Sequence, residues 1–176
     1  MATQLRPTFD RAYAAARLDQ LGIPRSAPAR QLSGGQQAQV ALALALGTRA
    51  EILLLDEPLA SLDPLARREF LHVLTDAVRS DGATALLSSH IVTDVEQACD
   101  NLIVLGVGRV LLHESVADAL ATHSISLTDR TDAVAAFAAA DGSLNWLVRG
   151  DADRPATLEE VVLGYLASAR TAAAAA

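Results

Sequence analysis

The stretch "EILLLDEPLASLDP" (Glu51–Pro64) joins an apolar run to a group of acidic residues. The run Ile52–Leu55 is typical of a strand that is buried on both faces of a sheet. Asp56 and Glu57 follow it directly, and open α/β sheets bind their ligands just beyond the C-terminal ends of such strands. Because successive side chains of an extended segment point in opposite directions, the two acids can serve different purposes.

A metal ligand and a base are the two purposes that suit adjacent carboxylates. One carboxylate can hold a hard cation such as Mg²⁺, and the other can face a water molecule as a general base. Pro58 fixes the backbone immediately after the pair. The same residues also fit a strand that ends in a solvated acidic turn, so the pair by itself leaves both interpretations open.

Polar residues also follow the next apolar run. In "LLSSH" (Leu86–His90), the residues Ser88, Ser89 and His90 leave the sheet at the same edge as the acidic pair. His90 could donate a hydrogen bond to a phosphate or to a nucleophilic water. The alternative is an ordinary helix cap formed by Ser89 beside an exposed histidine.

A glycine-containing turn precedes both runs. In "QLSGGQQAQVALALALG" (Gln31–Gly47), Gly34 and Gly35 lack a Cβ atom, so another molecule can approach the main chain closely. The N–H groups that open the following helix have no partner within it and can bind an anion such as a phosphate. The alternative is a helix that Ser33 caps, with the two glycines in the loop.

Strand and helix signals alternate through the first part of the chain, which predicts an α/β fold with a parallel sheet. The Ala/Leu run after the glycines is predicted as a helix because both residues are strong helix formers. The signals weaken beyond about residue 123. Expected helices are 9–21, the run that ends at Gly47, 64–79, 93–99, one that begins at Ser115 and one capped by Thr157 and Glu160; expected strands are 51–56, 83–88, 101–105, 109–113 and 143–150.

Composition narrows the classes of partner. The chain has 176 residues, 51% of them hydrophobic, and a formal net charge of −7. It has no basic patch, which argues against a nucleic-acid partner, and all 14 of its basic residues are arginines. The single cysteine, Cys99, permits no disulfide within the chain and fits a reducing compartment. No apolar run approaches the roughly 20 residues that span a bilayer, so we expect a soluble chain.

Four motifs together resemble those of the ATP-binding-cassette (ABC) transporter ATPases, in the same order and near the same spacing. They are "LSGGQ" (Leu32–Gln36), "ILLLDEP" (Ile52–Pro58), "LASLDP" (Leu59–Pro64) and "LLSSH" (Leu86–His90). The resemblance is to the C-terminal portion of such a subunit. It implies an incomplete P-loop NTPase fold, with a mostly parallel sheet flanked by helices and part of the helical lobe at the N-terminus.

The resemblance also suggests a division of the chain. We expect a partial nucleotide-binding domain at residues 1–122. Residues 123–176 are expected to form a C-terminal extension of the same domain, with a strand, a helix and a frayed alanine-rich tail.

Two of the motifs imply contacts across a dimer interface. Ser33, Gly34, Gly35 and Gln36 match the family's signature motif, which closes over ATP held by the other subunit of a head-to-tail dimer. Asp63 matches the aspartate of the D-loop, which communicates across the same interface. The resemblance therefore implies two partners, a second ABC ATPase subunit and a membrane-spanning permease, and a peripheral position at the cytoplasmic face of the membrane.

The other two motifs imply hydrolysis of ATP with Mg²⁺. Asp56 matches the Walker B aspartate that supports Mg²⁺. Glu57 matches the glutamate that polarises the attacking water, and His90 matches the switch histidine near the γ-phosphate. One D-loop position departs from the family, because Ala60 stands where a serine is usual.

The phosphate-binding loop of the family, Walker A, has no counterpart. Its pattern G-x-x-x-x-G-K-[ST] requires a lysine, and the sequence contains none. We therefore expect the chain alone to be inactive, as a nucleotide-binding subunit that lacks its N-terminal part. The alternatives are a non-catalytic partner module that supplies the signature in trans, and a non-functional gene remnant. DNA-repair ATPases with the same motifs need a long coiled coil, and the sequence shows none.

Overall fold

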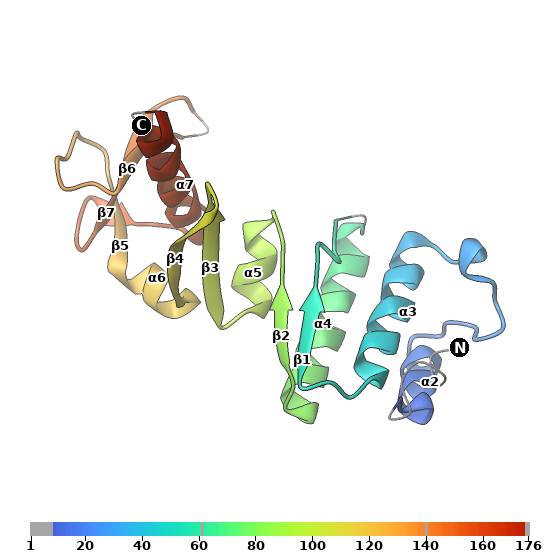
Figure 1. Cartoon of the computed structure of the whole chain (residues 1–176). Helices are drawn as coiled ribbons and strands as arrows, with labels where there is room; N and C mark the ends of the chain where they lie inside the picture. The colour runs from blue at the N-terminus through green and yellow to red at the C-terminus, as the bar shows by residue number, and fades with distance from the viewer. Residues whose placement is uncertain (1–8, 61, 140, 175–176) are drawn as a thin grey trace. The chain divides into compact units, whose positions relative to one another are not determined.

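The computed structural model describes residues 9–60, 62–139 and 141–174, and it divides into two compact units, residues 1–90 and 91–176 (Figure 1). The expected boundary after residue 122 stays a prediction about domains. The elements of unit 1 are α2 (Arg11–Gln20), the short 3-10 helix η1 (Ala29–Gln31), α3 (Gly34–Gly47), β1 (Ile52–Leu55), α4 (Pro64–Asp81) and β2 (Thr84–Leu87).

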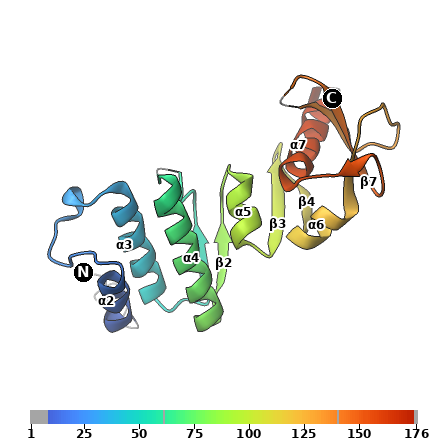
Figure 2. The ribbon, with the colours of Figure 1, turned by 180° about the vertical axis from the view of Figure 1, so that it is seen from behind.

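Unit 1 is built around one parallel pair of strands. Strands β1 and β2 pair in register from Ile52 opposite Thr84 to Leu55 opposite Leu87. Helix α4 connects them and covers one face, behind the strands in Figure 1 and in front of them in Figure 2. The buried residues of α4 are Phe70, Leu71, Leu74 and Ala77.

The opposite face of this pair corrects the expectation of strands buried on both sides. Ile52 and Leu54 are 64% and 74% exposed, and Leu86 is 56% exposed. An apolar run makes a strand suitable for burial on both faces. Burial of the second face also requires another helix or strand that packs on it, which the run itself does not provide. Among the described residues of unit 1, no helix or strand lies over this face.

Helix α2 is held against the rest of unit 1 by a cluster of charged side chains around Tyr13. The Arg49 guanidinium lies 3.6 Å from the centre of the Tyr13 ring and pairs with Asp10 at 3.2 Å and with Asp81 at 3.0 Å. The Tyr13 hydroxyl donates a hydrogen bond to Asp81 at 2.9 Å. These contacts join the start of α2 to the end of α4 by polar groups that are partly exposed.

Unit 2 is mainly antiparallel. Strands β3 and β4 form a hairpin, and the other four strands form a sheet in the order β6-β7-β5-β8. The expected strand at 101–105 thus pairs with its successor in an antiparallel hairpin. The elements of unit 2 are α5 (Val92–Ala98), β3 (Asn101–Gly106), β4 (Arg109–Ser115), α6 (Val116–Thr122), β5 (His123–Ser126), β6 (Ala135–Ala138), β7 (Leu144–Arg149), β8 (Arg154–Pro155) and α7 (Leu158–Ala174).

Helix α7 includes most of the alanine-rich tail, and the expected fraying of that tail stays a prediction. The helix continues to Ala174, since alanine is the strongest helix former, and residues 175–176 lie outside the described residues. No helix in the described part of the chain has both the length and the apolar character needed to cross a membrane.

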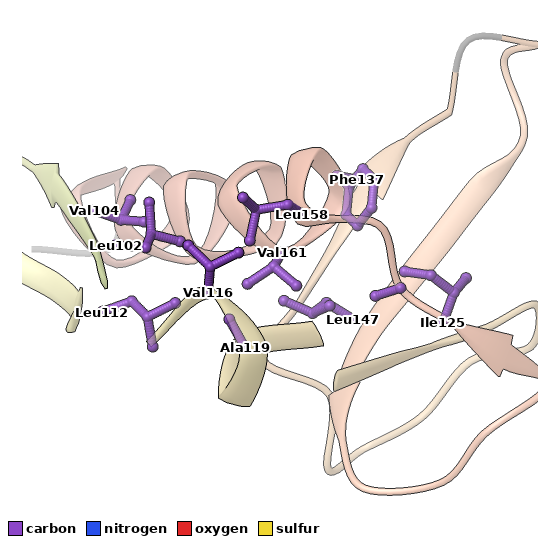
Figure 3. Close-up of a cluster of buried hydrophobic side chains, with 11 residues drawn as sticks. Leu102, Val104, Leu112, Val116, Ala119, Ile125, Phe137, Leu147, Leu158 and Val161 are labelled. Atoms are coloured by element: carbon purple, nitrogen blue, oxygen red, sulfur yellow. The ribbon is translucent and has the colours of Figure 1, made fainter. Parts of the chain in front are cut away.

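The core of unit 2 is a single aliphatic cluster (Figure 3). Residues from the hairpin, from α6, from the sheet and from α7 meet in it, and Ile125, Leu147 and Leu158 are completely buried. Helix α7 packs so closely on β7 that a Cβ atom added to Gly164 would lie 2.8 Å from the Cβ of Leu147. This glycine is therefore required by the close approach of the helix to the strand.

Gly164→Ala should destabilise unit 2, because the new methyl group would overlap Leu147 and neither backbone can move without loss of packing. We expect a loss of about 1–3 kcal/mol in the free energy of unfolding. The measurement is urea unfolding followed by the fluorescence of Trp146, the neighbour of Leu147 in β7. Arg170→Ala, at an exposed position of α7, is the control and should have little effect.

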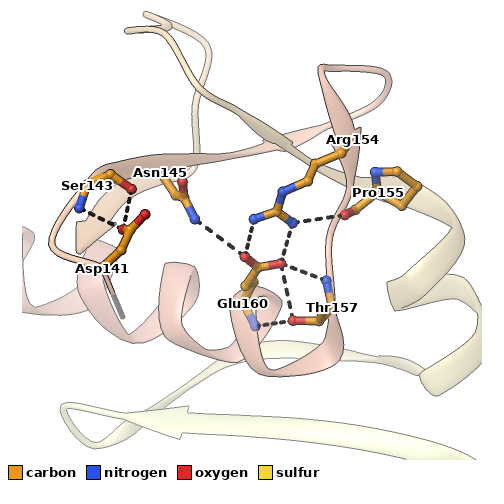
Figure 4. A network of polar contacts seen from close by, with 7 residues as sticks. All are labelled: Asp141, Ser143, Asn145, Arg154, Pro155, Thr157 and Glu160. Carbon is orange, nitrogen blue, oxygen red and sulfur yellow. Dashed lines mark hydrogen bonds and ion pairs between the residues drawn. The ribbon is translucent and has the colours of Figure 1, made fainter. Parts of the chain in front are cut away.

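A polar network holds the beginning of α7 (Figure 4). The guanidinium of Arg154 donates to both oxygens of Glu160, at 2.8 and 2.5 Å, and the Thr157 N–H donates to Glu160 Oε2 at 2.9 Å. The Glu160 N–H in turn donates to the Thr157 hydroxyl, which completes the predicted cap. Arg154, followed by Thr157, stabilises the charged carboxylate and lowers the pKa of Glu160 from 4.5 to about 2.

The stability of unit 2 should therefore depend on Glu160 in acid. A carboxyl group whose pKa is lowered in the folded state stabilises that state above its unfolded pKa, and the contribution is lost as the pH falls from about 4.5 to about 2. Glu160→Gln should cost about 1 kcal/mol near neutral pH, and the difference from the wild type should shrink across that window. Urea unfolding by Trp146 fluorescence at several pH values measures this, with Glu159→Gln, at the exposed neighbouring position, as the control. A difference that stays constant with pH would contradict it.

Candidate functional site

The C-terminal ends of β1 and β2 carry the polar residues that the sequence singles out. Asp56 and Glu57 follow β1, and Ser88 follows β2. The Ser88 hydroxyl donates a hydrogen bond to Asp56 Oδ1 at 2.7 Å and accepts one from the Glu57 N–H at 2.7 Å. One hydroxyl thus positions the first acid through its side chain and the second through its backbone.

Ser88 is the residue whose importance the sequence did not reveal. Leu55 and Leu87 are the last partners in the parallel register, so the next residues, Asp56 and Ser88, leave the strands side by side. The sequence does not reveal this register. Had the register been known, the serine that directly follows the second strand would have been predicted to lie beside the first acid.

Glu57 and His90 form the second contact of the site. His90 Nδ1 lies 2.8 Å from Glu57 Oε2, and their side chains are 65% and 43% exposed. Glu57 has a φ angle of 44°, in the left-handed region that non-glycine residues rarely adopt. Its N–H is bound by Ser88 and its carbonyl accepts the Ala60 N–H at 3.2 Å, so both peptide groups are fixed.

The two acids do serve different partners, but for a different reason from the one expected. The sequence predicts opposite directions because of an extended backbone, whereas Glu57 lies in a turn with positive φ. The turn directs its carboxylate to His90, while Asp56 remains with Ser88. Backbone strain of this kind is common at functional sites.

The donor set at this edge suits a magnesium–nucleotide complex better than a free ion. Among the described residues, no three histidine, cysteine or acidic side chains come together as metal ligands. Asp56 and the Ser88 hydroxyl offer oxygen atoms, and Mg²⁺ is usually held by one or two carboxylates together with phosphates and water. The residues present therefore fit a cation that arrives with phosphates.

The signature turn begins α3 as a capping box. The Ser33 hydroxyl accepts the Gln36 N–H at 3.2 Å, and the Gln36 side chain accepts the Ser33 N–H at 3.0 Å. Gly34 and Gly35 are the first helical residues and do not lie in a loop. A Cβ atom on Gly35 would lie 2.9 Å from the Cβ of Ala66, so this glycine also allows α3 to approach α4.

The cap leaves room for a second function of the same turn. It satisfies the amide of Gln36, whereas the amides of Gly34 and Gly35 belong to the first turn and have no partner within the helix. The structural role of Ser33 is therefore present, and the turn keeps the backbone donors that an anion would need.

Asp63 has a comparable structural role at α4. Its carboxylate accepts the N–H groups of Leu65 and Ala66, both at 3.0 Å, and Pro64 occupies the first turn. The beginnings of α3 and α4 and the ends of β1 and β2 lie at the same end of unit 1 (Figure 1). Among the described residues, no hydrogen bond or ion pair connects the signature turn with Asp56 or Glu57.

One buried side chain near this end is unsatisfied. Gln39, in α3, is 5% exposed, and neither its Oε1 nor its Nε2 has a hydrogen-bond partner. A buried polar group without a partner costs about 1–3 kcal/mol. Gln39→Met, which keeps a similar volume, should therefore raise the free energy of unfolding by about that amount.

Thermal unfolding by circular dichroism measures this gain in stability. Gln37→Met is the control, because Gln37 lies on the exposed side of the same helix. Equal shifts for both variants would mean that helix propensity, and not the removal of unsatisfied groups, is responsible.

Three kinds of comparison relate this chain to known proteins. Residues 20–93 match the family model described as AAA domain, putative AbiEii toxin, Type IV TA system. The phosphonates import ATP-binding protein PhnC 2 of Pseudomonas savastanoi is 44% identical over 99 residues, which are 55% of this chain and 36% of that protein. The aliphatic sulfonates import ATP-binding protein SsuB of Albidiferax ferrireducens is 44% identical over 114 residues, 63% of this chain and 41% of that protein.

The solved structures that match this chain are also subunits of ABC transporters. The cbiO1 subunit from Clostridium perfringens, part of the ABC transporter complex cbiONQ, matches with a TM-score of 0.56 and 33% identity over 63% of this chain and 45% of its own. A dimeric bacterial ABC transporter cassette matches with a TM-score of 0.52 and 29% identity over 60% of this chain and 46% of its own. The chain thus spans less than half the length of the relatives it matches. In its motifs, its fold and its relatives, the chain thus resembles part of one cassette of the ABC transporter ATPases.

Proposed function

We propose that the chain supplies the water-activating and signature elements of an ATPase that couples ATP hydrolysis to transport through a membrane permease. The observation that carries this proposal is the network of Asp56, Ser88, Glu57 and His90 at the ends of two parallel strands. Ligands of open α/β sheets bind at this position. The two relatives described above are import ATP-binding proteins, which supports the same conclusion.

In this proposal Glu57 receives a proton from the attacking water. Its fixed backbone and its contact with His90 hold the carboxylate in one orientation, so that a water molecule can be aligned for attack on the terminal phosphate. When the imidazole is protonated, Nδ1 donates to Glu57 and Nε2 can donate to a phosphate oxygen. His90 therefore links the base to the group that is transferred.

Asp56 is the residue that we assign to Mg²⁺. Mg²⁺ that is bound with ATP neutralises charge on the phosphates and orients them for in-line attack. The hydrogen bond from Ser88 orients the Asp56 carboxylate, and the same hydroxyl accepts the backbone N–H of Glu57. Binding of the phosphates themselves requires a further element, because this sequence has no lysine and no phosphate-binding loop.

A second candidate function rests on the capped turn at Ser33. The signature is present in full, from Leu32 to Gln36, and its helix is well formed. A module with an intact signature and no phosphate loop could serve the ATP that a complete subunit holds. Both candidates imply the same partners, a second ATPase subunit and a permease, and a position at the cytoplasmic face of the membrane.

Nucleotide binding tests the first candidate. A chimeric cassette joins the part of the Pseudomonas savastanoi relative that precedes its matched segment to this chain from Gln31 onward. Titration with a fluorescent ATP analogue and Mg²⁺ should show saturable binding to the chimeric cassette and at least a hundredfold weaker binding to the chain alone. Equal affinities would mean that the chain binds nucleotide by other residues, and would contradict the proposal.

A further inference from the structure

The Ser88 hydroxyl connects the two acids of the site by hydrogen bonds that run in one direction. It accepts the Glu57 N–H and donates to Asp56 Oδ1, each at 2.7 Å. A peptide N–H can only donate and an ionised carboxylate can only accept, so these partners fix the direction of the hydroxyl proton. The three groups therefore form a short chain from the backbone of Glu57 through Ser88 to the Asp56 carboxylate.

The main chain of Ser88 is itself fixed against β1. Its N–H donates to the carbonyl of Leu55 at 2.9 Å, and the preceding residue, Leu87, pairs with Leu55 in the parallel register. A serine side chain has one χ angle with three staggered positions, so its hydroxyl can reach few places from a fixed backbone. The hydroxyl is therefore held at the C-terminal end of β1, where the two acids begin.

Glu57 needs such support because of its backbone conformation. Its φ of 44° lies in the left-handed region, which a residue with a Cβ atom adopts only when the surrounding structure holds it there. Its N–H donates to Ser88 at 2.7 Å, and its carbonyl accepts the Ala60 N–H at 3.2 Å. The contact with Ser88 is the shorter of the two. We therefore expect that loss of the hydroxyl lets φ relax and turns the carboxylate away from His90.

The acceptor at the far end of the chain strengthens the hydrogen bond at Glu57. A hydrogen bond to a charged group is roughly twice as strong as a neutral one, and linked hydrogen bonds polarise one another. Asp56 thus acts on the Glu57 N–H through Ser88, although that N–H donates to the hydroxyl and not to Asp56. We propose that Ser88 is a positioning residue, which couples the metal-binding carboxylate of Asp56 to the orientation of the base Glu57. This inference rests on the proposed function.

This coupling brings the metal ligand and the base into one arrangement before the nucleotide binds. Both acids are exposed, and exposed side chains otherwise sample several rotamers. With the hydroxyl in place, the carboxylate of Asp56 is held from one side, and that of Glu57 is held by its backbone and by His90 at 2.8 Å. Ser88 acts on the attacking water only through Glu57. Its removal should therefore lower kcat much more than it changes the KM for ATP.

The first test follows hydrogen exchange of the Glu57 amide by NMR in the full 176-residue chain without nucleotide. Rates are compared as protection factors, because residue 56 also affects the intrinsic exchange rate of its neighbour. Ser88→Ala should lower the protection factor about tenfold, since it removes the acceptor, and Ser88→Thr should preserve it. Asp56→Asn should lower it about threefold in the wild type and leave it unchanged in a chain that carries Ser88→Ala. Ser80→Ala, at an exposed position of α4, is the control and should have no effect.

The second test measures steady-state ATP hydrolysis by the chimeric cassette. Ser88→Ala should lower kcat at least tenfold and change the KM for ATP by less than about twofold, because the bound substrate then meets a poorly oriented base. Ser88→Thr should restore kcat, since it supplies the same hydroxyl. Circular dichroism verifies that each variant is folded. If Ser88→Ala does not fold, Asp56→Asn remains decisive, because it must lower the protection of the Glu57 amide in a chain whose serine is intact.

Three outcomes would overturn the proposal. They are equal protection of the Glu57 amide in the wild type and in Ser88→Ala, an effect of Asp56→Asn that is the same with and without Ser88→Ala, and a kcat that Ser88→Ala leaves unchanged. The second outcome would mean that the two acids are positioned independently. The expected protection factors together with a wild-type chimeric cassette that does not hydrolyse ATP would contradict the proposed function and leave the coupling intact. Hydrolysis at the same rate by the wild-type and Ser88→Ala chimeric cassettes would do the reverse.

Discussion

Glu57→Gln in the chimeric cassette should reduce ATP hydrolysis at least a hundredfold, since a general base contributes about 10²–10⁴ to the rate. The amide keeps the shape of the side chain and loses the charge that accepts a proton from water. It can still contact His90, and the backbone contacts with Ser88 and Ala60 do not involve the side chain. The positive φ at residue 57 should therefore persist, and ATP binding should remain.

Phosphate release and nucleotide titration on the same preparation separate the two effects. Glu51→Gln is the matched control, because this exposed glutamate lies at the other end of β1 and should leave the rate unchanged. A Glu57→Gln variant that hydrolyses ATP at the wild-type rate would mean that the base lies elsewhere. Loss of ATP binding would mean that Glu57 acts in the structure and not in the reaction.

Ser33→Arg should abolish the activity that this chain lends to another subunit. The measurement mixes the chain with a chimeric cassette whose own signature carries Ser33→Arg. In the mixed dimer, one site pairs the phosphate loop of the chimeric cassette with the signature of the added chain. Addition of the wild-type chain should then restore hydrolysis, and the loss of donors at a transition-state charge typically costs about 10²–10³ in rate.

The arginine variant changes both the cap and the surface that meets the phosphate, so the control must separate these. Loss of an N-cap costs roughly 1 kcal/mol of stability. Ser115→Arg removes an equivalent cap from α6, where the Ser115 hydroxyl accepts the Asp118 N–H at 2.9 Å, and should still stimulate hydrolysis. If the wild-type chain and Ser33→Arg stimulated ATP hydrolysis equally, the signature turn would serve only as a helix cap. Absence of stimulation by a folded wild-type chain would favour a gene remnant.

The sequence predicted unit 1 well because its signals are local. Asp63 with Pro64 marks the start of α4, and Ser33 with Gln36 marks the start of α3, so each helix carries its own cap. The strands at 52–55 and 84–87 are apolar runs between turns, and they appear within one residue of the expected bounds. Their common end then brought Asp56, Glu57 and His90 together as expected.

Unit 2 was less predictable because its strands depend on their partners. Strands β5 ("HSIS") and β6 ("AAFA") are short and contain small or polar residues with little intrinsic preference for extended structure. Both are formed by pairing with β7, which the sequence did predict. Likewise, the role of Ser88 follows from register, and the φ of Glu57 follows from contacts on both of its peptide groups, neither of which a local pattern contains.

The most direct test of the whole account is the steady-state release of phosphate from saturating ATP and Mg²⁺ by the chimeric cassette, with the chain alone measured beside it. Because Asp56, Glu57 and His90 in the chimeric cassette come from this chain, turnover there reports on these residues. The account predicts Mg²⁺-dependent turnover by the chimeric cassette of about 1–10³ per second, the usual range of enzymes, and none above background by the chain alone. A folded chimeric cassette that binds ATP and releases no phosphate would contradict it, as would turnover in the same range by the chain alone.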